Sequence, residues 1–350
     1  DDCSSRGLGD VYKRQRQSPT MAPRRKAVAA VAESDEAGED MKTEIVEGWP
    51  QGHEIRILIS ETDASQVNAI RRALIADVPK LAITRVDFSQ GVTQDNKGEV
   101  VESVNVLPDE VLAHRLAMIP IPTNLKEPLY YPNECPKCID VVERDKGCPV
   151  CQVLYTLSAR GPASDADEEF RTVYAGDITT ISDPEYDIRD EHKSIPLTVL
   201  AKGQFLEFYA FAVLGRGRDH AKWSPASAVG FQPHRVAVLN KPKKASVLFE
   251  LGLTTTDGTP INAKLFGKDK RLTNINHVMD LEKALHQVGE GTGRETAFDD
   301  AITLETVDGS YIFSYETDGS LSPVDAFNAA LDELKNRFNN LSEDLTSALA

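Results

Sequence analysis

The sequence predicts an α+β fold in which helices cover antiparallel sheets, together with a separate, mostly β unit that carries a four-cysteine metal loop. Two observations predict the main fold. Strand-like alternation is followed by helix-like spacing of apolar residues near residue 54, and both patterns return after residue 240. Between about residues 89 and 240 the pattern consists mainly of strands, and two Cys-x-x-Cys pairs lie within it. The middle stretch therefore predicts the separate unit.

Composition narrows the class of protein. The chain has 350 residues, of which 41% are hydrophobic and 27% charged, as in soluble globular proteins. Its net charge of −16 argues against a general nucleic-acid coat, because binding to phosphates depends on clustered Lys and Arg. The richest apolar run, FLEFYAFAVL, is too short for a membrane helix. Without a secretory signal, we expect a cytoplasmic protein whose cysteines are thiols or metal ligands.

The first 44 residues are expected to lie outside the fold. SSRGLGDVYKRQ resembles translated sequencing-adapter sequence, so we expect the natural start at Met21 or Met41. The basic PRRK and the acidic ESDEAGED that follow have too few apolar groups to offset the entropy of ordering. We predict a disordered tail.

Residues 45–88 predict a strand, a helix and a second strand. EIRILIS, residues 54–60, alternates isoleucines on one face and should open the fold. The helix follows, with Asp63 as its cap and Pro79 as its stop, and its apolar stripe is Val67, Ile70, Leu74 and Val78. LAITRVDF then predicts the second strand.

Residues 89–240 form the separate unit. LPDEVLAHRLAMIPIPT predicts a short helix that runs into an extended segment punctuated by prolines. The cysteine loop follows, and then VLYTLSA and QFLEFYAFAVL predict strands. The Gly- and charge-rich segment GRGRDHAKWSPAS predicts a surface loop near the end of the unit.

Residues 241–345 return to the alternation of strands and helices. ASVLFELGL predicts a strand, and a helix follows with Val278, Leu281, Leu285 and Val288 as its stripe. AITLETV and YIFSYET predict two strands separated by the turn dipeptide Asp308-Gly309.

The chain closes with its strongest helix signal. Ser322 is the expected N-cap, Pro323 the first helical residue, and Asp325 should reach back to the cap. A narrow apolar seam then recurs at alternating three and four over three heptads, through Val324, Phe327, Leu331, Leu334, Phe338, Leu341 and Leu345. Such a seam covers the protein's own sheet or faces another chain, and the pattern leaves both open.

Four cysteines carry the most specific chemical signal. The pairs Cys135/Cys138 and Cys148/Cys151 each present two thiolates from a tight turn, and tetrahedral sulfur ligation suits Zn²⁺. An iron–sulfur cluster uses the same ligands, and two disulfides or free thiols are the bland alternatives. Because a full cysteine set leaves no coordination position for a substrate, we interpret the site as a structural staple.

No residues are assigned a catalytic role. The basic loop concentrates cations and an aromatic side chain suited to docking, through Arg216, Arg218, His220, Lys222 and Trp223. His220 lacks a recognisable nucleophile and supporting acid. GEGTG at 289–293 predicts a flexible turn and KPKK at 241–244 a solvated connector. No Asp triad of the kind that holds two magnesium ions is present.

Five ordered blocks together resemble the alpha-like subunits of cellular RNA polymerases, specifically the archaeal D-type subunit family. The resemblance covers most of residues 45–345. The blocks are NAIRRALIADVPKLAI, LPDEVLAHRLAMIPI, the cysteine loop with QVLYTLSARGP, LAKGQFLEFYAFAVLGRGRDHAKWSPASAVGF, and YIFSYETDGSLSPVDAFNAAL.

The resemblance implies a non-catalytic assembly subunit of a DNA-directed RNA polymerase. A dimerisation domain built from residues 45–88 and 241–345 would pair with the small alpha-like subunit L. The unit inserted at 89–240 would carry the basic loop toward the second-largest subunit, with subunits N and P as neighbours and DNA contacted only indirectly. The implied interface residues are Asn68, Arg71, Leu74, Phe327, Leu331, Leu334, Phe338 and Leu341.

One departure from that family bears on cofactors. Many archaeal relatives carry a ferredoxin-like insertion with cluster cysteines before the final strands, whereas residues 232–310 of this chain contain no cysteine. The sequence assigns no function to residues 262–300. The alternative to an assembly subunit is a zinc-ribbon nucleic-acid-binding protein, which the cysteine loop, KPKK and the basic loop suggest.

Overall fold

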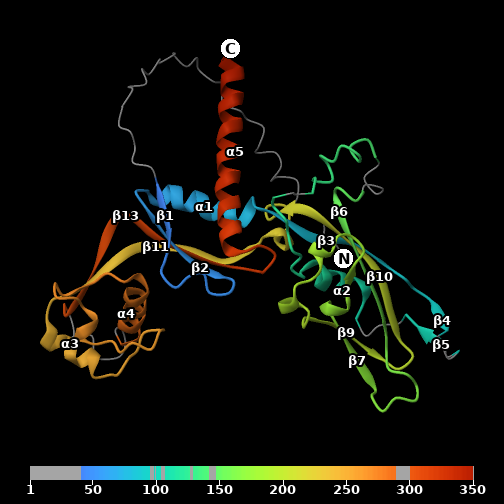
Figure 1. Ribbon diagram of the computed structural model, residues 1–350, viewed down its shortest axis with the longest axis horizontal. Coiled ribbons are helices and arrows are strands. Elements are labelled where there is room, and N and C mark those ends of the chain that lie inside the picture. The colour runs from blue at the N-terminus through green and yellow to red at the C-terminus, as the bar shows by residue number, and fades with distance from the viewer. Residues whose placement is uncertain are drawn as a thin grey trace, which may run out of the picture. The chain divides into compact units, whose positions relative to one another are not determined.

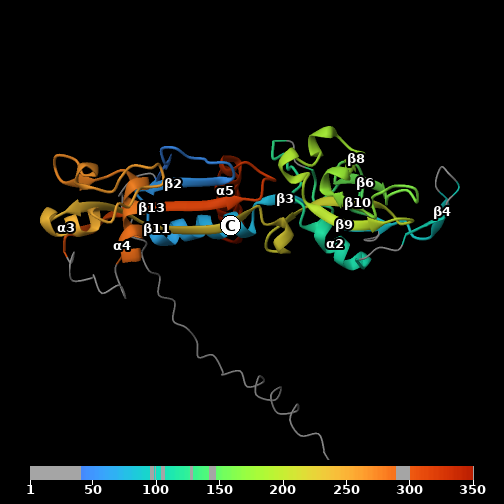
Figure 2. The ribbon, with the colours of Figure 1, turned by 90° about the horizontal axis from the view of Figure 1, so that it is seen from below.

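The computed structural model describes residues 41–94, 98, 100–103, 107–126, 129–141, 147–288 and 300–349. Its first sheet is antiparallel and five-stranded, with β2, β13 and β11 side by side at its centre (Figure 2). In spatial order the strands are β1 (Lys42–Ile45), β2 (Glu54–Ser60), β13 (Ile302–Thr317), β11 (Ala226–Leu239) and β12 (Arg271–Leu272). Segments from both ends of the chain thus share one sheet.

Two helices pack on the face of this sheet that carries the buried isoleucines of β2. They are α1 (Ala64–Ala76) and α5 (Pro323–Leu349), and their apolar side chains share a core with Phe313. The Asp63 carboxylate caps α1 by accepting hydrogen bonds from the backbone N–H groups of Ser65 and Gln66. The Ser322 hydroxyl accepts from the Asp325 backbone N–H at 3.1 Å. Both predicted caps are confirmed.

The second sheet is four-stranded and antiparallel, in the order β3 (Pro79–Phe88), β10 (Phe205–Arg216), β6 (Gln152–Arg160) and β8 (Thr179–Thr180). Helix α2 (Asp109–Ala117) packs on β3, and its Leu112 and Leu116 are fully buried beside Tyr155 and Phe208. Two antiparallel two-stranded sheets complete this part, one of β4 (Val92–Gln94) with β5 (Val100–Glu102) and one of β7 (Phe170–Tyr174) with β9 (Pro196–Ala201).

A third hydrophobic core lies between helices α3 (Pro242–Phe249) and α4 (Ile275–Val288). Strand β12 and the adjoining ends of β11 and β13 also contribute side chains to it. We call residues 240–288 and 300–304 the α3–α4 lobe (Figure 1). Val278 and Leu281 of the predicted stripe are buried in this core. Short 3-10 helices lie at Ala175–Asp177, Pro184–Tyr186, Asp190–His192, Ala221–Trp223 and Ala263–Leu265.

The strand predicted for ASVLFELGL is wrong, because most of this segment forms helix α3. Pro242 occupies the first turn, where a missing N–H costs nothing and a fixed φ favours the helix. Ala245 and Leu248 then fall three residues apart on the buried face. The segment therefore forms a helix, as the spacing of its buried residues favours, although its β-branched and aromatic residues favour a strand.

The predicted break at Asp308-Gly309 is also wrong, because β13 runs without reversal from Ile302 to Thr317. The dipeptide forms a bulge instead. Tyr311 pairs with Pro233 and Thr306 with Arg235, so four residues of β13 lie opposite one residue of β11. Gly309 has φ +66°, a conformation that favours glycine, and its carbonyl accepts a hydrogen bond from Thr62.

The N-terminal prediction needs a correction of a few residues. Strand β1 spans Lys42–Ile45 and pairs with β2, so the fold opens before residue 54 and residues 42–44 are not part of a disordered tail. The predictions for residues 1–40 and for GEGTG at 289–293 lie outside the described residues.

The predicted domain boundaries at residues 88/89 and 240/241 do not coincide with the boundaries between the two sheets. Strand β3, which we placed with the dimerisation domain, pairs with β10 of the middle unit. Strand β11, which we placed in the middle unit, pairs with β13 of the first sheet. Alternation along a strand reports its buried face and not its partner, so sequence pattern could not locate these exchanges. The division into domains stays a prediction.

Candidate functional site

The four cysteines of the loop converge on one point. Their Sγ atoms all lie within 4.8 Å of one another, with 3.6 Å between Cys135 and Cys148, 3.9 Å between Cys138 and Cys151, and 3.6 Å between Cys148 and Cys151. Each pair closes a tight turn: the Cys138 N–H donates to the Cys135 carbonyl, and the Cys151 N–H donates to the Cys148 carbonyl. These separations are far longer than a disulfide bond of about 2.05 Å.

The geometry fits a single tetrahedral ion. Zinc–sulfur bonds of about 2.3 Å place the sulfurs of a regular tetrahedron roughly 3.8 Å apart, which matches the observed separations. The thiols of a polynuclear iron–sulfur cluster bind different irons and must stand further apart. Three of the four cysteines are buried, and buried thiolates require a cationic partner. The residues present therefore fit a structural zinc ion.

The thiols differ in their readiness to ionise. Burial opposes ionisation of Cys148, but hydrogen bonds from the Val150 backbone and the other three thiols outweigh it and lower its pKa to about 7. Burial raises the pKa of Cys151 to about 12. Cys148 is thus the thiol that ionises more readily, and a metal must displace the proton of Cys151.

The apolar seam of α5 divides into two halves. Phe327 is 5% exposed and packs in the core of the first sheet, with Leu331 and Leu334 partly buried beside it. From residue 335 onward every described side chain of α5 is exposed, and the seam residues Phe338, Leu341 and Leu345 are 66%, 53% and 54% exposed. Figure 1 shows this distal half, which we define as residues 335–349, extending beyond α1. No helix in the described ranges is long and apolar enough to cross a membrane.

The proposed interface residues of α1 differ in the same way. Leu74 is fully buried in the core of the first sheet. Asn68 and Arg71 are half-buried, and the Arg71 Nε donates a hydrogen bond to the Asn68 Oδ1 at 3.0 Å. Helix α1 packs against α5, and of these three side chains Asn68 and Arg71 reach solvent.

The basic loop, residues 216–223, is closed by contacts within the chain. Arg216 forms a bidentate ion pair with Glu333 of α5, at 2.6 and 3.2 Å, and its Nε donates to the Tyr131 hydroxyl. Lys222 donates to the Ile83 carbonyl, and Trp223 donates from its indole to the Val213 carbonyl. Three of the five predicted docking residues, Arg216, Lys222 and Trp223, therefore hold the loop in place.

Close approach requires glycine at two positions, Gly215 just before the loop and Gly217 within it. A Cβ at Gly215 would lie 2.2 Å from the Trp223 ring, and a Cβ at Gly217 would lie 2.1 Å from the Ile75 carbonyl oxygen of α1. His220, at the tip, is exposed, and its Nδ1 accepts a hydrogen bond from the Lys222 backbone. Arg218 is also exposed. The loop therefore presents Arg218 and His220 outward from a rigid base.

Sequence analysis missed the partners of these cations. Asp77, at the C-cap of α1, is 5% exposed and pairs with Arg337 of α5 at 2.6 Å and with Arg218 at 3.8 Å. A carboxylate at the negative end of a helix is unfavourable without a cation, and this signal could have found the site. Together with Arg216 and Glu333, these residues tie the basic loop to both α1 and α5.

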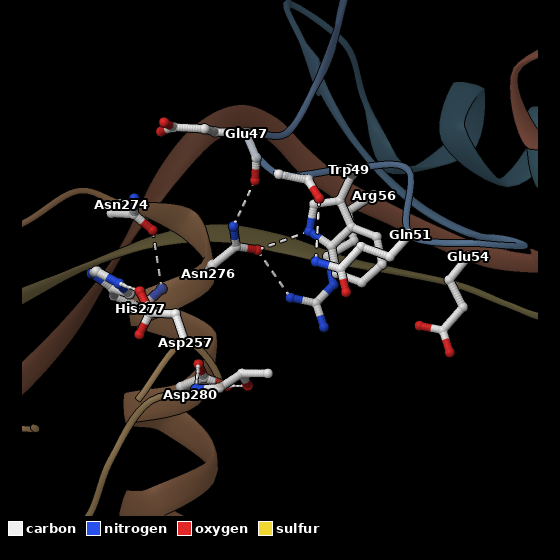
Figure 3. Close-up of a pocket in the computed structure, with 12 residues that line it drawn as sticks. Glu47, Trp49, Gln51, Glu54, Arg56, Asp257, Asn274, Asn276, His277 and Asp280 are labelled. Atoms are coloured by element: carbon white, nitrogen blue, oxygen red, sulfur yellow. Dashed lines mark hydrogen bonds and ion pairs between the residues drawn. The ribbon is translucent and has the colours of Figure 1, made fainter. Parts of the chain in front are cut away.

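A pocket of about 570 Å³ lies beside the β1–β2 connection and the start of α4 (Figure 3). Asn276 occupies its centre: the amide oxygen accepts from the Trp49 indole and the Arg56 guanidinium, and the amide nitrogen donates to the Glu47 carbonyl. His277 pairs with Asp257 at 2.9 Å. These polar groups form hydrogen bonds with one another. The bonds of Asn276 join the α3–α4 lobe to the first sheet and the β1–β2 connection.

Comparisons with known proteins agree with this architecture. Residues 56–338 match the model of the RNA polymerase Rpb3/Rpb11 dimerisation domain. The chain is 34% identical to the DNA-directed RNA polymerase subunit Rpo3 of Picrophilus torridus, over 83% of the chain and 96% of that protein. It is 33% identical to Rpo3 of Thermoplasma volcanium (81% and 92% covered). It is 29% identical to subunit 3 of RNA polymerases II, IV and V of Arabidopsis thaliana (83% and 88% covered). The chain therefore belongs to the Rpb3/Rpb11 dimerisation domain family, as an Rpo3-like subunit of the archaeal D type.

Proposed function

We propose that this chain is a non-catalytic, cytoplasmic assembly subunit of a DNA-directed RNA polymerase that forms a heterodimer with the small alpha-like subunit L. The observation that carries the proposal is the exposed apolar stripe on the distal half of α5. A helix surrounded by water is marginally stable by itself, and its exposed Phe and Leu side chains each gain about 1.5–3 kcal/mol on burial. A partner helix laid along the stripe supplies that burial.

The two halves of α5 have different parts in this proposal. The proximal seam, with Phe327 and Leu331, fixes the helix on its own sheet. The stripe of Phe338, Leu341 and Leu345 then meets the partner, and Asn68 and Arg71 of α1 border the same interface. Leu74 and Phe327 contribute through the core, because they hold the two helices in place.

The basic loop supports a second contact, with the second-largest polymerase subunit. Arg218 and His220 are exposed at its tip, while Arg216 and Trp223 fix its base. A rigid loop loses little conformational entropy on docking, which favours such a role. Subunits N and P as further neighbours follow from family resemblance alone.

Co-expression with subunit L tests the heterodimer. Replacing Phe338 and Leu341 with Ser should weaken pairing by at least about tenfold, because two apolar anchors are removed. The matched control replaces Asn336 and Asn340 with Ser on the opposite side of the helix and should pair normally. Intact pairing of the Phe338/Leu341 variant, with unfolding unchanged in both, would contradict the proposal.

We further propose that the four cysteines hold one Zn²⁺ ion as a structural staple. Elemental analysis of the purified chain should find about one zinc per chain. Replacing Cys135 with Ser should release the metal and make the cysteine loop more susceptible to proteolysis, while pairing with subunit L persists. Cys3→Ser is the control and should retain the metal. Iron with visible absorption in place of zinc would contradict the assignment.

A further inference from the structure

The α3–α4 lobe carries a basic surface on an otherwise acidic chain. One basic segment is KPKK at 241–244, which is exposed to solvent as expected but begins helix α3 and is not the predicted connector. The other is KDKR at 268–271, which leads into strand β12. Each cation in the two segments is exposed.

The fold brings these segments together. The Leu239 N–H donates to the Lys270 carbonyl at 2.9 Å, and Arg271 pairs with Val238 across the ladder of β11 and β12. Lys241, the N-cap of α3, comes two residues after Leu239. A turn closed by hydrogen bonds between Gly267, Lys270 and Arg271 then holds the second segment beside the first. We call the cations of residues 241–244 and 268–271 the lobe basic surface.

Most of its charge is not neutralised within the chain. Lys241 pairs with Asp300 at 3.5 Å, and Arg271 pairs with Glu305 at 2.7 Å. Four further lysines form no ion pair with any residue that the structure describes: Lys243, Lys244, Lys268 and Lys270. Asp269 is the one carboxylate within the two segments. The surface therefore keeps a net positive charge.

The surface is also held on a rigid base. Ala245 and Leu248 anchor α3 in the lobe core, which Leu272 joins from β12. The lobe itself is fastened to the first sheet through Asn276 and its three hydrogen bonds (Figure 3). The backbone that carries the four lysines is therefore part of the folded lobe, while their side chains are exposed to solvent.

We propose that the lobe basic surface binds the phosphate backbone of duplex DNA without regard to sequence. An array of lysines supplies flexible point charges that release counterions from phosphates, whereas base recognition depends on positioned Arg, Asn or Gln side chains. The choice of DNA as the polyanion rests on the proposed function, since a DNA-directed polymerase holds duplex DNA. A direct contact at this surface departs from the indirect contact that the family resemblance implies. This surface is separate from the cysteine loop.

Fluorescence anisotropy with a duplex of about 30 base pairs at low salt tests the proposal on the full chain. The variants Lys243→Glu/Lys244→Glu and Lys268→Glu/Lys270→Glu should each weaken binding by at least about tenfold. Each phosphate that a variant no longer neutralises should reduce the slope of log K against log salt by about 0.9. The control Lys126→Glu/Lys202→Glu makes the same charge change outside the lobe and should bind nearly as the parent does.

Three results would overturn the proposal: no binding of the parent chain to duplex at low salt, equal weakening in the control, or tighter binding of poly-glutamate than of DNA at matched charge. The last result would identify an acidic protein segment as the partner. Pairing with subunit L is measured on the same variants. Because the substituted lysines lie away from α1 and α5, normal pairing together with abolished DNA binding separates this surface from the assembly function.

Discussion

The distal half of α5 and the basic loop were both predicted to face other subunits. In the structure the loop is held by contacts within the chain, whereas the distal half of α5 is exposed to solvent. The loop is closed, since Arg216, Lys222 and Trp223 all bind partners within the chain. The distal half of α5 is open, since Phe338 and Leu341 have more than half of their surface in water. The unusual composition of the loop therefore reflects contacts that fix its own conformation, whereas the apolar seam of distal α5 leaves an exposed apolar surface.

The largest expected effect is a loss of stability that distinguishes the buried proximal part of α5 from its exposed distal half. Phe327→Ala should reduce the free energy of unfolding by about 3–5 kcal/mol, because it leaves a cavity in the core of the first sheet. Phe338→Ala should change it by less than about 0.5 kcal/mol, because that ring lies in solvent. Chemical denaturation of the chain without its partner measures both. Equal losses of stability would show that the two halves do not differ.

A second test concerns the closed state of the loop. Gly217→Ala should destabilise the chain by roughly 1–3 kcal/mol, since the new Cβ meets the Ile75 carbonyl and forces the backbone apart. Gly230→Ala is the control, because no atom lies within 4 Å of its Cβ position. Thermal unfolding of the two variants decides the comparison. A stable Gly217 variant would mean that the loop yields easily.

A third test measures the bridge between the two regions. A double-mutant cycle with Arg216→Gln and Glu333→Gln should give a coupling energy of about 1–2 kcal/mol, because the pair is bidentate and about four-fifths of each side chain is buried. Urea denaturation supplies the four free energies. A coupling energy near zero would show that the loop and α5 are held independently.

The smallest expected effect concerns Arg218. Its side chain is 55% exposed and 3.8 Å from Asp77, so Arg218→Ala should cost less than about 1 kcal/mol. Arg337→Ala should cost more, because it removes the 2.6 Å partner of a nearly buried carboxylate. Differential scanning calorimetry can rank the two variants. A larger loss of stability for Arg218→Ala would show that Arg218 of the loop, and not Arg337 of α5, is the main cation that stabilises the Asp77 carboxylate.

Local sequence signals located the elements whose formation depends on local chemistry. The alternating isoleucines of β2, the Asp63 cap of α1 and the Ser322 cap of α5 are confirmed. The ligand spacing of the four cysteines also located a site that can hold a metal. In these cases the residues that decide the structure lie within a few positions of one another.

Features that depend on distant partners could not be predicted in this way. The pairing of β3 with β10 and the burial of Arg216 against Glu333 join residues far apart in the chain. The seam of α5 has the same apolar spacing at Phe327 and at Phe338, yet Phe327 packs against the core of the first sheet and Phe338 is exposed. Helix α3 was missed because its short apolar run fits either period.

The continuous strand β13 has a mechanical consequence. Ile302 and Leu304, at its start, pack in the α3–α4 lobe, whereas Phe313 and Tyr315, near its end, lie in the core beneath α5. The Tyr315 hydroxyl donates to the Pro323 carbonyl in the first turn of α5. A force applied to the lobe is therefore carried along the backbone of one strand to the first turn of α5, and the bulge at Asp308-Gly309 is the place on that path where the ladder with β11 is interrupted.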